Sequence, residues 1–193
     1  LYENGISYHG SATALGRLAG SSTAFSLGEV NGDLVVVTSD SRNNHRLTVM
    51  HESESDEGTA FDVLSGLPNA AHPERIGKPG ESVYAVRIIN NRAYVVTYER
   101  MDPLYVIDLS DTADPLVLGE LEIPGVSNYL HPIGDNLLLG IGLDGTDDVN
   151  SEWSGWFRGV KVALFDVTDP VNPVELKQYL IGDRGSHSQA QHN

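Results

Sequence analysis

The chain has 193 residues, of which 40% are hydrophobic and none is cysteine; it can build a packed core, but it offers no disulfide, thiolate nucleophile or thiolate metal ligand. Its 12 Lys and Arg stand against 27 Asp and Glu, so the formal net charge is −15. This balance excludes a nucleic-acid partner, because phosphate binding needs clustered basic residues.

The first predicted unit covers residues 23–80 and follows residues 1–22, which we assign to the last strand or strands of a preceding unit. Strands are expected at residues 23–30 and 34–40, because the turn Asn31-Gly32-Asp33 between two apolar runs is a hairpin signal. A third strand is expected at 46–53. The acidic segment 52–58 indicates an exposed loop, and a fourth strand is expected within 59–77.

Two further units follow, at residues 81–125 and 126–182. Each has two apolar runs joined by a tight turn, a third run, a polar turn that ends in Pro, and a fourth run alternating apolar and polar residues. The predicted strands of these units cover residues 82–89, 93–99, 104–110 and 116–123, and then 127–133, 137–143, 160–168 and 174–181. Residues 183–193 are expected to begin another unit.

The last two units share a register that locates one insertion. Asp166 lies 58 positions after Asp108, whereas the first turns, at Arg92 and Asn136, are only 44 positions apart. The third unit therefore carries an insertion between Leu143 and Gly159, in the connection between its second and third strands.

The polar turn after each third strand has a structural interpretation. Asp108 and Asp166 are each followed two residues later by a hydroxyl residue, Ser110 or Thr168. A carboxylate in this position accepts hydrogen bonds from main-chain NH groups of its own turn. We therefore predict that these acids stabilise turns and do not act in catalysis.

Four strands per unit is the pattern of a propeller blade, so the fold class is all-β, a β-propeller with four-stranded antiparallel blades. About three blades and partial flanking strands are present. Known rings need about four to eight blades, so we expect an arc of a larger ring, completed by a longer chain or by self-association.

Four segments resemble a known family, the bacterial secreted proteins with a carboxy-terminal β-propeller domain distantly related to WD-40 repeats. The likeness runs from about Phe25 to the end, departs most over residues 42–76, and is carried by residues 80–125, 126–142, 160–182 and 185–191. The resemblance implies a secreted, periplasmic or cell-surface protein without an assigned activity. It therefore carries over no functional residues.

The insertion between Leu143 and Gly159 is the first candidate site, because loops on a rigid scaffold carry binding residues. Its oxygen ligands suit calcium, although their spacing does not match an EF-hand; these acids are Asp144, Asp147, Asp148 and Glu152. Its aromatic residues suit a glycan or protein partner, with packing against the blade as the alternative; they are Trp153, Trp156 and Phe157.

Three further candidates lie in predicted first strands, which surround the central channel of a propeller. Arg87, His131 and His187 would converge there on a small ligand, the alternative being solvated or hydrogen-bonded side chains. The chain has no G-x-S-x-G elbow, no H-E-x-x-H pair and no G-x-x-x-x-G-K phosphate loop. A catalytic constellation is therefore not predicted.

The sequence favours a non-enzymatic binding or scaffold module that presents loops to a protein or glycan partner. A metal-dependent, calcium-binding propeller hydrolase and a purely structural ring-forming segment are the alternatives. No cofactor is expected apart from calcium. No membrane-spanning segment is expected either, because no apolar run approaches the ~18 residues needed.

Overall fold

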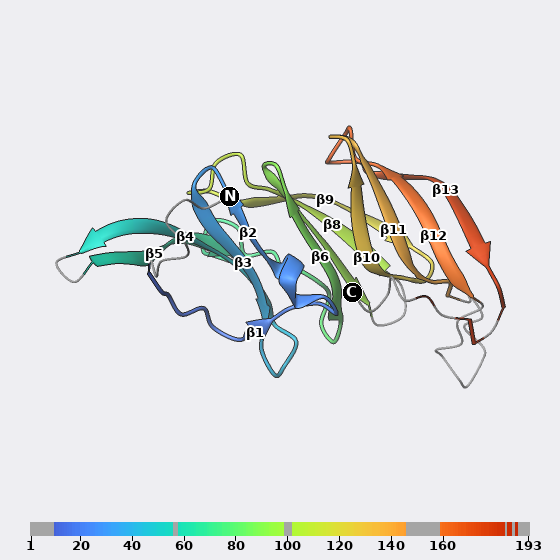
Figure 1. The fold of residues 1–193 in the computed structure, drawn as a ribbon, viewed down its shortest axis with the longest axis horizontal. Coiled ribbons are helices and arrows are strands. Elements are labelled where there is room, and N and C mark those ends of the chain that lie inside the picture. Colours follow the sequence, from blue (N-terminus) through green and yellow to red (C-terminus); the bar gives the residue numbers. More distant parts are fainter. Residues whose placement is uncertain are drawn as a thin grey trace, which may run out of the picture.

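The computed structural model describes residues 10–55, 58–98, 102–145, 159–183, 185–186 and 188. No α-helix occurs in these ranges, and the strands form three antiparallel sheets that lie side by side in chain order (Figure 1). The expected all-β fold of four-stranded antiparallel blades is confirmed.

The strands of each sheet follow the order of the chain. The first sheet contains β1 (Arg17–Leu18), β2 (Leu27–Val30), β3 (Asp33–Ser39), β4 (His45–Ser55) and β5 (Gly58–Leu67). The second contains β6 (Ser82–Ile89), β7 (Arg92–Tyr98), β8 (Asp102–Asp108) and β9 (Leu116–Ile123). The third contains β10 (Val126–Ile133), β11 (Leu137–Leu143), β12 (Val160–Asp166) and β13 (Val174–Ile181).

The first strand of the first sheet differs from the expectation, because it is interrupted. Both β1 and β2 pair antiparallel with β3, β1 at the end of that strand and β2 at its start. Between them lies a 3-10 turn, η1 (Thr23–Ser26), where the sequence predicted a continuous strand. Residues 17–18 thus belong to the first sheet and not to a preceding blade.

The expected acidic loop at residues 52–58 is also corrected, because β4 continues to Ser55 and pairs with β5 from Gly58 onward. The acids are tolerated because they do not oppose one another. Glu52 lies opposite Phe61, and Glu54 lies opposite Thr59. Like charges directly opposite would be destabilising, whereas these pairs leave the backbone ladder intact.

Two apolar clusters join the sheets. One packs the first sheet against the second and includes Val37, Val95 and Ile107, each 0% exposed. The other packs the second sheet against the third around Phe165 and Leu104. Near-continuous runs of β-branched and large apolar residues suit these sheets, because the second is covered on both faces by its neighbours and the first and third are each covered on one.

The turns after the third strands have the predicted structure. Asp108 Oδ1 accepts hydrogen bonds from the backbone N and the hydroxyl of Ser110, at 2.9 and 2.7 Å. Asp166 Oδ1 accepts one from the backbone N of Thr168 at 2.8 Å. Hydrogen bonds from Thr168 lower the pKa of Asp166, as expected of a carboxylate that accepts donors from its own turn.

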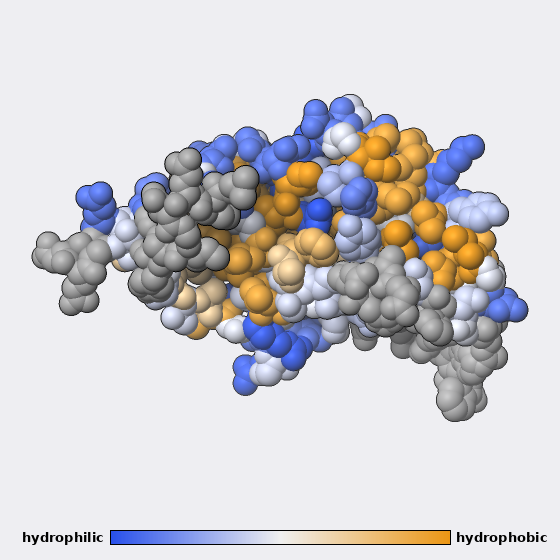
Figure 2. Space-filling model, viewed as in Figure 1, coloured by the Kyte–Doolittle hydropathy of each residue, from blue (hydrophilic) through white to orange (hydrophobic). Residues whose placement is uncertain are grey.

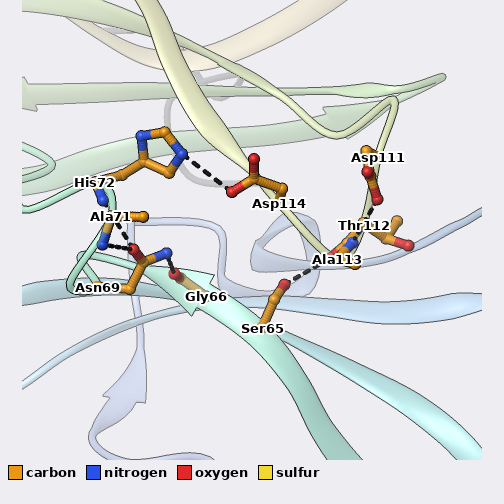
Figure 3. Close-up of polar contacts among 9 residues, drawn as sticks. All are labelled: Ser65, Gly66, Asn69, Ala71, His72, Asp111, Thr112, Ala113 and Asp114. Atoms are coloured by element: carbon orange, nitrogen blue, oxygen red, sulfur yellow. Dashed lines mark hydrogen bonds and ion pairs between the residues drawn. The ribbon is translucent and has the colours of Figure 1, made fainter.

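The first of these turns is held by the preceding sheet (Figure 3). The Ser65 hydroxyl donates to the carbonyl of Thr112, and His72 Nε2 lies 3.0 Å from Asp114 Oδ1. Asn69 shapes the loop that brings His72 there, because its Oδ1 accepts from the backbone N of His72 at 2.8 Å. The turn motif therefore also joins neighbouring blades.

Hydrophobic side chains remain exposed on the third sheet, over which Figure 2 shows hydrophobic colouring on the face in view. Leu176, Leu180 and Ile181 of β13 are 47%, 45% and 50% exposed. This strand has a partner on one side only, β12. Its outer side is an open edge in the described structure.

Candidate functional site

The first strands of the three sheets meet at the inner edge of the arc. β2 contacts β6, and β6 contacts β10. The turn η1 leans onto β6, because the backbone N of Ser21 donates to the carbonyl of Tyr84 at 2.9 Å and the Ser26 hydroxyl closes the turn onto the carbonyl of Ala19. The break in the first strand thereby carries Phe25 toward the other two sheets.

Four side chains form a cluster at this edge, which we call the inner-edge cluster: Phe25, Arg87, Tyr129 and His131. The guanidinium carbon of Arg87 lies 4.3 Å from the centroid of the Phe25 ring. The Phe25 and Tyr129 rings are 5.7 Å apart, and the Tyr129 hydroxyl lies 3.1 Å from His131 Nδ1. Arg87 of β6 thus contacts Phe25 of η1, which contacts Tyr129 of β10. His131 continues this row on the same strand.

Arg87 is the electrostatic centre of the inner-edge cluster. Its side chain is half-buried, and it forms neither a hydrogen bond nor an ion pair within the described part of the chain. The cation–π contact with Phe25 stabilises the guanidinium without using its five N–H donors. Those donors match the planar, paired oxygens of a carboxylate, phosphate or sulfate group.

Of the residues predicted from the sequence, the structure brings Arg87 and His131 into one cluster. Phe25 and Tyr129 were missed. Tyr129 stands two residues before His131 in the same strand, a spacing that places both on one face and that signals their proximity. Phe25 gave no such signal, because the sequence predicted a strand where the structure has η1.

The remaining candidates are distributed differently. Asp144 is 6% exposed and follows β11, with its backbone N bonded to the carbonyl of Gly159 at 3.0 Å, so the two ends of the insertion lie together. The other candidates lie outside the described residues; they are Asp147, Asp148, Glu152, Trp153, Trp156, Phe157 and His187. Among the residues that the structure does describe, no group of three or more His, Asp or Glu is placed to hold a metal ion.

A row of four-stranded antiparallel sheets whose first strands meet at one edge is the arrangement of blades in a β-propeller. The family model described as "Beta propeller domain" matches residues 1–193, and the chain belongs to that family. In the described ranges no helix has the length and apolar character needed to cross a membrane.

Two archaeal relatives extend the comparison. An uncharacterised protein of Methanocaldococcus jannaschii is 40% identical over 157 residues, which cover 80% of this chain and 22% of the relative. An uncharacterised protein of Archaeoglobus fulgidus is 32% identical over 169 residues, 88% of this chain and 23% of the relative. The chain thus spans less than a quarter of the length of either relative, and both relatives are archaeal, whereas the sequence resemblance was to bacterial proteins.

Proposed function

We propose that the chain is a non-enzymatic binding module whose inner-edge cluster takes an anionic group of a protein or glycan partner. One observation carries the proposal. Arg87 is held half-buried by Phe25 and has no acidic partner in the described structure, although the chain carries 27 acids. The donors of this guanidinium are not buried and no acid of the described chain uses them, so they are available to a ligand.

The chemistry of the cluster favours an isolated carboxylate. A guanidinium binds a carboxylate through two parallel hydrogen bonds, and the neighbouring Tyr129 and His131 offer further polar contacts. The net charge of −15 opposes the approach of a densely charged polyanion. We therefore expect a ligand with a single acidic group, such as a uronate residue of a glycan or an acidic side chain of a protein.

The insertion and the location of the protein belong to the same proposal. The insertion begins at Asp144, on the rigid third sheet, and loops placed in this way carry partner-binding residues. We propose that its acids bind calcium and that the protein acts outside the cytoplasm, as the family resemblance implies. A thermal-shift measurement with calcium and then chelator, and fractionation of the source cells, test these two points.

The test of the inner-edge cluster is a binding screen with the 193-residue chain. An array of glycans with and without uronate groups, together with acidic and neutral peptides, is screened for ligands that require a carboxylate. For the ligand found, we expect Arg87→Gln to weaken binding at least about tenfold, since one bidentate charged contact is lost. Arg87→Lys restores only part of this, because it keeps the charge and loses the paired donors.

Arg17→Gln is the matched control, because Arg17 is an exposed arginine on β1 away from the cluster. It is expected to bind as the wild type does. A screen without any acidic ligand, or an acidic ligand held equally well by Arg87→Gln, overturns the proposal. The first of these outcomes favours the purely structural alternative, and metal-dependent turnover of a bound glycan favours the hydrolase.

A further inference from the structure

A polar crevice of about 340 Å³ lies between the second and third sheets, on the side of their first hairpin turns. Its walls are the β6–β7 turn and the β10–β11 turn, with Ser110 of the next turn at its border. A volume of this size is at the lower end of the range for small-molecule sites. The crevice is separate from the inner-edge cluster, none of whose four residues lines it.

Tyr94 contributes a hydroxyl group that is open to the crevice. This residue of β7 lines the crevice and is 2% exposed, yet its hydroxyl makes no hydrogen bond within the described part of the chain. The ring of Tyr94 is buried, whereas its hydroxyl is among the atoms that solvent can reach, since it is not one of the buried side-chain atoms without a partner. The hydroxyl is thus available to donate to or accept from a molecule bound in the crevice.

The rim adds donors and acceptors that are equally free. The side-chain amides of Asn91 and Asn136 have no hydrogen-bond partner among the described residues, although their backbone carbonyls are paired. Arg92 uses Nη1 to donate to the carbonyl of Val167 at 2.9 Å, which leaves its other N–H donors available. Asp135 supplies a carboxylate that forms no ion pair in the described structure.

We propose that this crevice binds one neutral hexose unit. The hydroxyls of a sugar both donate and accept, as an amide pair, a phenol, a guanidinium and a carboxylate require together. Arg92 and Asp135 carry opposite charges, so an anion or a cation would gain one contact and be repelled by the other. Pro132 and Leu138 add an apolar wall for the CH face of the ring.

The inference extends the proposed binding function but uses different residues. Arg87 and Tyr94 are direct cross-strand partners in β6 and β7, so the two sites adjoin across one strand pair. A glycan with an acidic and a neutral sugar therefore has a place for each. Separate substitutions at the two sites can distinguish failure of one from failure of the other.

The test titrates the 193-residue chain with glucose, galactose, mannose and N-acetylglucosamine, each followed by NMR chemical shifts. We expect saturable binding of at least one sugar with a dissociation constant of about 1–10 mM, as is usual for few contacts to a small ligand. Tyr94→Phe removes only the hydroxyl and should weaken binding about fivefold. Asn91→Ala, on the exposed rim, should do the same without touching the core.

Tyr179→Phe makes the same chemical change as Tyr94→Phe at a residue of β13 that is 71% exposed, and should leave sugar binding unchanged. Hexose binding without any carboxylate ligand would overturn the proposed function and support the crevice. The inference is overturned if no sugar saturates, or if binding is insensitive to both Tyr94→Phe and Asn91→Ala.

Discussion

The two seams between neighbouring sheets have similar apolar clusters but treat their polar groups differently. At the seam between the first and second sheets, buried polar side chains have partners within their own sheets, and one of them, His45, also bonds a backbone carbonyl across the seam. At the seam between the second and third sheets, Arg92 is bonded to the carbonyl of Val167, but other polar side chains around the crevice lack partners in the described structure. The first arrangement joins blades, and the second leaves hydrogen-bonding groups available for a ligand.

His45 and Glu81 form the centre of the first seam. His45 Nε2 donates to the carbonyl of Glu81 at 2.9 Å, and the Ser39 hydroxyl donates to Nδ1 at 2.8 Å. The Glu81 carboxylate accepts from the Thr97 hydroxyl at 2.6 Å and from the backbone N of Lys78 at 2.8 Å. Both ring nitrogens of His45 and Oε2 of Glu81 thereby have specific partners in this seam.

Phe165 forms the centre of the second seam, and its removal is expected to have the largest effect. Its side chain is 0% exposed and packs in the cluster that joins the second and third sheets. Phe165→Ala should lower the free energy of unfolding by about 3–5 kcal/mol, through lost burial and the cavity that remains. Urea denaturation followed by circular dichroism measures the change.

Leu176→Ala is the control for this substitution, because Leu176 is 47% exposed on β13. Its effect should stay within about 0.5 kcal/mol, as for most surface positions. A loss below ~1 kcal/mol for Phe165→Ala would mean that the second seam is not a continuous core.

The two seams show which parts of the structure could be predicted from the sequence and which could not. Periodic apolar runs and the Asn31-Gly32 turn, whose residues have φ of 53° and 88°, locate strands and hairpins through local chemistry alone. The inner-edge cluster depends on contacts between residues far apart in the chain, such as Phe25 with Arg87. No sequence feature near Phe25 indicates that the first strand is interrupted there. The position of the interruption is therefore determined by tertiary contacts with β6.

The crevice and the polar contacts of the first seam could not be predicted from local sequence, for the same reason. Tyr94 reads as an ordinary strand residue, and only the approach of the β10–β11 turn makes its hydroxyl part of a site. His45 likewise appears as one histidine among seven until Glu81 is placed beside it. Which histidines are buried is a property of how the blades pack.

Lowering the pH should weaken the first seam selectively. Burial lowers the pKa of His45 from its usual 6.5, an effect that Glu81 and Asp40 only partly offset. The unfolded chain therefore takes up a proton before the folded chain does, so the stability contributed by neutral His45 is complete above pH 6.5 and is lost as the pH falls toward the folded-state pKa. The effect should be smaller than that of Phe165→Ala.

The measurement compares denaturation of the wild type and His45→Gln between neutral pH and pH 5. The glutamine amide can still donate to the Glu81 carbonyl, but it does not titrate, so the variant should lose less stability on acidification. His131→Gln, at an exposed position on β10, should retain the wild-type slope. Parallel slopes for wild type and His45→Gln would contradict the assignment.

Asp33 contributes to stability in a different pH range. Burial alone would raise its pKa, but hydrogen bonds from Thr112 and His51 outweigh this and lower the pKa, so the stability that Asp33 contributes is lost only below pH 3.8.

The smallest effect is expected at the surface of the first seam, where Lys78 pairs with Glu122. Their side chains are 49% and 44% exposed, so solvent and salt screen the attraction although Glu122 raises the pKa of Lys78. Lys78→Met should change the free energy of unfolding by no more than about 0.5 kcal/mol. Denaturation at low and high salt measures it, with Lys177→Met, at an exposed position on β13, as the control. A loss well beyond that of the control, and unchanged by salt, would show that this ion pair joins the blades as the buried pairs of the seam do.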